Sequence, residues 1–109
     1  MRRMAHAVHL RPDKADEYLR LHREVWPEVL ARIAASNIRN YSIFLRRPEL
    51  LLVSTWEYVG DDFEADMARM RADVATQRWW RLTDPCQIPF PSHGDGELWV
   101  GLDEVFHHD

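Results

Sequence analysis

The order of apolar patterns along the chain limits its fold more than any other feature. Apolar residues that alternate along the sequence indicate strands, and apolar residues three or four apart indicate helices. We expect strands at 3–10, 38–45, 50–58 and 97–107, and helical segments at 12–36 and 63–82. This order, β, α, β, β, α, β, predicts an α+β fold of the ferredoxin-like, split βαβ type, with a four-stranded antiparallel sheet and the helices on one face.

Proline and aspartate residues divide the two helical segments further. Pro27 has no amide hydrogen and its ring clashes with the preceding turn, so the first segment is expected to kink or break near Trp26. Gly60-Asp61-Asp62 offers an N-cap for the second segment, and Asp73 is a point at which that segment can divide. Residues 83–96 include three prolines and two glycines, which predicts a loop long enough to act as a lid.

The composition is that of one globular domain spanning residues 1–109. Hydrophobic residues make up 46% and charged residues 29%, and the net charge of −4 gives no attraction to phosphate backbones, so nucleic acid is not an expected partner. Cys86 is the only cysteine, which favours a reducing compartment and hence the cytoplasm. We find no signal-peptide pattern and no apolar run long enough for a bilayer, so no membrane association is expected.

Several strands carry apolar or aromatic residues on both faces. In the second strand Phe44 faces away from Tyr41 and Ile43, and in the last strand Trp99 faces away from Leu98. A sheet face that lies in water normally carries polar residues at alternate positions. We therefore expect the second face to be covered by another chain or to enclose a ligand, and a homodimer of the dimeric α/β-barrel type is the economical solution.

His22 is the best candidate for proton transfer. On a helix it lies four residues after Tyr18, so both side chains project from the same face and can meet one cavity. Imidazole changes charge near neutral pH, and a neighbouring hydroxyl can orient it or a substrate. From the spacing alone, a hydrogen-bonded histidine at the margin of the core is the more common case.

Other catalytic patterns are weak. The six histidines form no local chelate, because His6 and His9 point to opposite faces of a strand and so do His107 and His108; we expect no metal site. Cys86 reads as a plain loop cysteine, and the chain has no nucleophile elbow and no glycine-rich phosphate loop. Weak base candidates that remain are Asp84, Asp103 and Glu104.

Tryptophan is unusually frequent, with five residues in the chain. Core packing and an oligomer interface explain some of them. Sugar binding is the functional alternative, with indole rings against the C–H faces of a sugar and hydroxyls held by Tyr18, Tyr41 and Asn40. The adjacent Trp79 and Trp80 project about 100° apart on a helix, so one ring can enter the core while the other lines a site.

Five sequence motifs, in the same order, resemble the L-rhamnose mutarotase family. They are Glu17-Tyr18 with His22, Val25-Trp26-Pro27-Glu28, Asn40-Tyr41-Ser42-Ile43, Trp79-Trp80 with Thr83-Asp84, and Glu104-Val105-Phe106. The resemblance implies a small cytoplasmic dimer that interconverts the anomers of a 6-deoxy-L-hexose without a cofactor. It also implies that His22 is the catalytic proton donor and that Tyr18, Tyr41, Trp79 and Trp80 contact the sugar.

Mutarotation needs proton transfer and little else, which agrees with these residues. L-Rhamnose is the expected substrate, with L-fucose as an alternative. Two other classes remain open from the sequence. A dimeric ferredoxin-like chain can be a cofactor-independent monooxygenase or haem-degrading enzyme, or it can be a sugar-sensing module without catalysis.

Overall fold

The computed structural model describes all 109 residues and contains the expected order of elements. The strands and helices are β1 (Arg2–Leu10), α1 (Ala15–His22), α2 (Pro27–Ala35), β2 (Ile38–Arg46), β3 (Leu51–Tyr58), α3 (Phe63–Ala72), α4 (Val74–Thr83), β4 (Gln87–Ile88) and β5 (Val100–Gly101). Short 3-10 turns, Pro12–Lys14 and Asp84–Cys86, precede α1 and follow α4. Both predicted helical segments are thus divided into two helices each.

The two divisions lie where proline and aspartate were expected to cause them. Pro27 is the first residue of α2, and Trp26 before it is extended (φ −60°, ψ 135°), so α1 already ends at His22. Asp73 is also extended (ψ 126°), and its carboxylate accepts a hydrogen bond from the Thr76 amide at the start of α4. His22 is therefore the last residue of α1.

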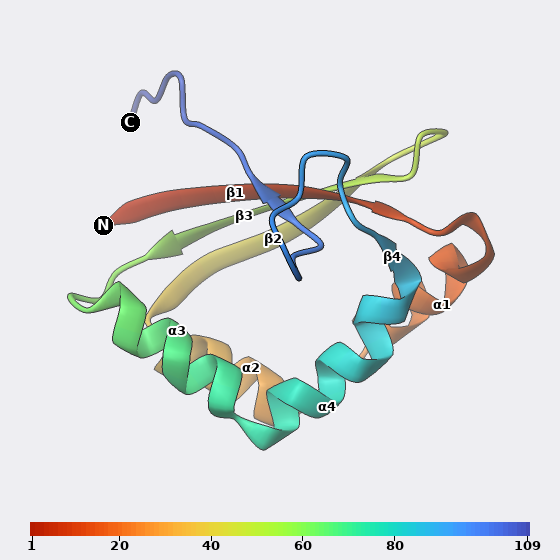
Figure 1. Cartoon of the computed structure of the whole chain (residues 1–109). Coiled ribbons are helices and arrows are strands. Elements are labelled where there is room, and N and C mark those ends of the chain that lie inside the picture. The colour runs from red at the N-terminus through yellow and green to blue at the C-terminus, as the bar shows by residue number, and fades with distance from the viewer.

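The sheet is antiparallel, with strand order β2-β3-β1-β4, and β5 also pairs with β1. The four helices lie on one side of it, and no helix covers the other side (Figure 1). This arrangement confirms the predicted ferredoxin-like fold class. None of the four helices is long and apolar enough to cross a bilayer.

The predicted last strand, 97–107, is mostly wrong. Its position beside β1 is shared by two short strands, β4 and β5, and the ladder ends with the Leu102 amide, which donates to the Ala5 carbonyl at 2.8 Å. Beyond that point Val105 is 94% exposed and Phe106 is 80% exposed. Alternation at 102–106 predicted a strand, but pairing with β1 covers only Val100 and Gly101, and without a hydrogen-bond ladder the residues after Leu102 form no strand.

The core lies between the sheet and the helices. Its central cluster contains Val8, Leu10, Ala15, Tyr18, Leu52 and Cys86. The β1–β3 register pairs Val8 with Leu52 and His6 with Ser54, so these residues share the face that the helices cover. On this face of β1, Val8 and Leu10 pack in the core, whereas His6 lines a cavity.

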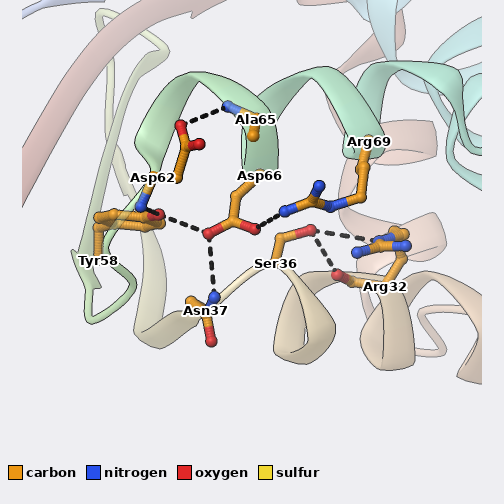
Figure 2. Close-up of polar contacts among 8 residues, drawn as sticks. All are labelled: Arg32, Ser36, Asn37, Tyr58, Asp62, Ala65, Asp66 and Arg69. Carbon is orange, nitrogen blue, oxygen red and sulfur yellow. Dashed lines mark hydrogen bonds and ion pairs between the residues drawn. The ribbon is translucent and has the colours of Figure 1, made fainter.

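A buried carboxylate fixes the position of α3. Asp66, in the first turn of α3, accepts hydrogen bonds from the Tyr58 hydroxyl, from the Asn37 amide at 2.9 Å and from Arg69 at 2.6 Å (Figure 2). These donors lower the pKa of Asp66 to about 2. Acidic residues near helix starts are normally solvated, but this one ties α3 to the end of β3 and to the turn before β2.

Candidate active site

A cavity of about 370 Å³ lies between the helix-covered face of the sheet and helices α1 and α4. Its wall includes the five residues to which the family resemblance assigns catalysis and sugar contact: His22, Tyr18, Tyr41, Trp79 and Trp80. They come from α1, β2 and α4, elements that are far apart in the sequence. The volume falls in the range of small-molecule sites.

The imidazole of His22 is held in a defined orientation. Its Nδ1 lies 2.8 Å from the backbone carbonyl oxygen of Tyr18, and because a carbonyl only accepts, Nδ1 carries the hydrogen of the neutral ring. The ring stacks on Tyr18 at 4.2 Å between centroids and meets Trp79 edge-on at 5.2 Å. Nε2 is consequently the nitrogen available to a bound molecule, with a free lone pair when the ring is neutral.

The environment of His22 favours that neutral ring. Partial burial lowers the pKa of His22 below its ordinary value of 6.5, and the hydrogen bond with the Tyr18 carbonyl opposes this effect in part. The sequence suggested that the Tyr18 hydroxyl orients the imidazole. In the structure the backbone carbonyl of Tyr18 does so, which leaves the hydroxyl for other contacts.

Tyr18 itself is almost fully buried, with 3% of its surface exposed. Burial raises the pKa of its hydroxyl above the ordinary value of 10.0, so the hydroxyl keeps its proton at neutral pH. It can donate and accept hydrogen bonds but does not act as a base there.

Both adjacent tryptophans of α4 reach the cavity. Trp79 is buried and packs edge-on against His22 and against Trp26, at 5.3 Å between ring centroids for the latter pair. Trp80 is half-buried and also lines the cavity. We expected one of these rings to pack in the core and the other to line a site. Trp79 does both, because it is buried and also lines the cavity.

Sequence reasoning missed several residues of the cavity wall. His6 stacks on Trp56 at 5.9 Å between ring centroids, and both rings line the cavity with Gln87 and Trp99. Burial lowers the pKa of His6. One signal was present for His6: it is a polar residue between the apolar Met4 and Val8 on one face of β1.

Other candidates lie elsewhere. Asn40, expected to hold a sugar hydroxyl, donates to Glu57 and lines a separate hollow with Asp103 and Glu104. Glu104 is held in an ion pair with Arg3 at 2.7 Å. Asp84 does line the cavity, at its exposed rim, where partial burial raises the pKa of its carboxyl.

Cys86 and the histidines show no other catalytic arrangement. The Cys86 thiol is buried, which raises its pKa and keeps it in the unreactive thiol form. His6 and His9 lie on opposite faces of β1, where His6 stacks on Trp56 and His9 on Phe90. No group of three or more histidine, cysteine, aspartate or glutamate side chains lies close enough together to hold a metal ion.

Comparison with known proteins links the chain to one family. A family model described as L-rhamnose mutarotase matches residues 3–108. A relative from Oceanobacillus iheyensis, named L-rhamnose mutarotase, is 32% identical over 109 residues, which cover 100% of both chains.

Two solved structures share the fold of this chain. The L-rhamnose mutarotase FA22100 from Formosa agariphila superposes with a TM-score of 0.79 at 20% identity, covering 100% of both chains. An antibiotic biosynthesis monooxygenase superposes with a TM-score of 0.60 at 18% identity, covering 94% of this chain and 97% of that one. Likenesses at this level of identity establish the shared fold alone.

Proposed function

Because the chain belongs to the L-rhamnose mutarotase family, we propose that it is an isomerase that interconverts the α and β anomers of L-rhamnose, with His22 as the proton-transfer group. One observation carries the proposal: His22, Tyr18, Tyr41, Trp79 and Trp80 line a single cavity. The proposed reaction needs no cofactor, since it moves one proton and leaves the sugar's composition unchanged.

The reaction uses the free nitrogen of His22. Nε2 takes the proton from the anomeric hydroxyl while the bond between C1 and the ring oxygen breaks and C1 becomes a carbonyl. The imidazolium then donates this proton to the former ring oxygen. Rotation about the C1–C2 bond presents the other carbonyl face, and the same steps in reverse close the ring. The Tyr18 carbonyl, 2.8 Å from Nδ1, stabilises the imidazolium between the two transfers.

The remaining residues bind and enclose the sugar. We assign hydroxyl contacts to Tyr18 and Tyr41, and packing against the sugar's C–H surfaces to Trp79 and Trp80. A 6-deoxy sugar suits the apolar part of the wall, because its methyl group loses no hydrogen bond there, whereas a 6-hydroxyl group does. Ile43 and Leu98 belong to this apolar part.

The experiment compares anomer exchange of L-rhamnose and L-fucose side by side, by exchange NMR of their anomeric protons. Faster exchange of L-rhamnose supports the proposal. Faster exchange of L-fucose assigns the activity to that sugar instead, and binding without faster exchange favours a sugar-sensing module. Oxygen consumption with an aromatic substrate, and no effect on either sugar, favours the monooxygenase alternative.

The activity is expected to fall in acid with a midpoint below the ordinary histidine pKa of 6.5. The lowered pKa of His22 keeps Nε2 unprotonated until the pH drops through that value, and protonation then removes the base. His6 and Asp84 also titrate in the same cavity. The pH profile of exchange should therefore be compared with an NMR titration of the His22 ring; midpoints that differ would contradict this assignment.

A homodimer through the helix-free face is also part of the proposal. On that face Phe44 is 61% exposed, and the tail that carries the exposed Val105 and Phe106 borders the same face beside Arg3 and Thr55. Apolar groups of this size are normally covered. We expect the protein to sediment as a dimer and Phe44→Asp to sediment as a monomer. A wild-type monomer at all concentrations would contradict the dimer.

We place this enzyme in the cytoplasm. Its one cysteine, Cys86, is buried and unpaired, which suits a reducing compartment. Fractionation of the native host with an antibody against the protein tests this placement.

A further inference from the structure

The side chain of Gln87 contains the only buried side-chain oxygen or nitrogen without a hydrogen-bond partner, its Oε1. Gln87 is 7% exposed, and it lines the same cavity as His22 and Tyr18. A buried amide oxygen without a partner is unfavourable, so proteins rarely keep one unless a ligand or ordered water satisfies it.

The backbone holds this amide in place. Gln87 begins β4 and pairs with Leu10 of β1, so the two side chains share the face that the helices cover. On the same edge of β1, the Arg11 amide donates to the carbonyl of Cys86 at 2.8 Å. Gln87 therefore cannot turn out to solvent without breaking the edge of the sheet.

The neighbours of the Gln87 amide indicate which ligand group could donate a hydrogen bond to Oε1. Tyr18 and Gln87 line the same cavity, and the Gln87 side chain opposes the rise that burial causes in the pKa of the Tyr18 hydroxyl. Thr83, also on the wall, is buried. An acceptor at this position selects a ligand that brings a hydrogen-bond donor, and the donors of a neutral sugar are its hydroxyl groups.

We propose that Gln87 binds the substrate directly, with Oε1 accepting a hydrogen bond from one hydroxyl group of the sugar. This inference rests on the proposed function and adds a specificity-determining residue to it. Gln87 selects sugars that carry this hydroxyl, because a sugar without it leaves Oε1 without this hydrogen-bond donor. It takes no part in proton transfer, since an amide does not titrate near neutral pH.

The test is Gln87→Met, which keeps the size of the side chain and removes the amide. The matched control is Met at the other glutamine, Gln77→Met, whose amide donates to the Arg71 carbonyl outside the cavity. We expect Gln87→Met to raise KM for L-rhamnose by about 10- to 100-fold with kcat nearly unchanged. Its thermal stability should equal or exceed that of the wild type, because no unpaired oxygen remains.

A set of sugars distinguishes binding from packing. The dissociation constants of L-rhamnose and of its 2-deoxy, 3-deoxy and 4-deoxy analogues are measured by calorimetry for the wild type and both variants. We expect the wild type and Gln77→Met to bind one analogue about 10-fold more weakly than L-rhamnose, and Gln87→Met to bind the two equally.

Equal losses for every analogue in all proteins would overturn the assignment, and so would unchanged affinity of Gln87→Met, since water then satisfies the amide. A large drop in thermal stability would make Gln87 a structural residue. Failure of the proposed function looks different, because the wild type then fails to accelerate L-rhamnose exchange at all.

Discussion

Replacement of His22 by glutamine is expected to reduce anomer exchange by about 10²- to 10⁴-fold while the protein stays folded. Glutamine is polar and similar in size to histidine, so local packing is largely kept. It cannot take a proton and return it. The expected loss equals about 3–5 kcal/mol of transition-state stabilisation. Exchange NMR at saturating L-rhamnose measures this loss as a change in kcat.

A matched histidine controls for general effects of the substitution. His93 lies in the exposed loop after β4, and its Nδ1 also contacts a backbone carbonyl, that of Gly94 at 2.7 Å. His93→Gln should leave exchange unchanged. If His22→Gln exchanges anomers as fast as His93→Gln, His22 has no role in proton transfer and the mechanism above is wrong.

Trp79→Ala is expected to have the largest effect on stability. Trp79 is 6% exposed and packs against both His22 and Trp26, so truncation leaves a large cavity that costs about 3–5 kcal/mol. This is a large share of the roughly 5–15 kcal/mol that holds a typical domain together. Urea unfolding followed by circular dichroism measures the change.

Trp80→Ala provides the matched comparison. Trp80 is the next residue on α4 and is half-buried, so we expect its truncation to destabilise the protein much less. Both variants should lose affinity for L-rhamnose, because both rings line the cavity. Equal stability losses would contradict the dual role of Trp79, and full sugar affinity in Trp80→Ala would remove that ring from the binding site.

Features set by local geometry could be predicted from the sequence. The periodicity of each segment indicated its type, and Pro27 and Asp73 marked the divisions between helices because their effect on the backbone is local. The meeting of Tyr18 and His22 follows from their spacing on one helix, and the rings do stack at 4.2 Å.

Features set by tertiary packing could not be predicted in this way. Gln87 lies in a strand of two residues that owes its position to pairing with Leu10, and no periodicity exists in so short a segment. Alternation at the C-terminal end predicted a long strand, but only Val100 and Gly101 of that segment pair with β1. Asn40 has a positive φ of 52° in a bulge of β2, which directs it away from the cavity that Tyr41 lines.

An antibiotic biosynthesis monooxygenase has a similar fold, so the fold alone does not determine the activity. The same arrangement of strands and helices supports different chemistries, so the activity depends on which side chains enter the cavity. Here the cavity holds an oriented imidazole among hydroxyl groups and indole rings.

The central claim is that this cavity catalyses anomer exchange of L-rhamnose. Exchange NMR of the anomeric protons, recorded at increasing concentrations of the wild-type protein, tests it most directly. The exchange rate is expected to rise linearly with protein concentration above the spontaneous rate. A folded protein that leaves the spontaneous rate unchanged at every concentration would contradict it.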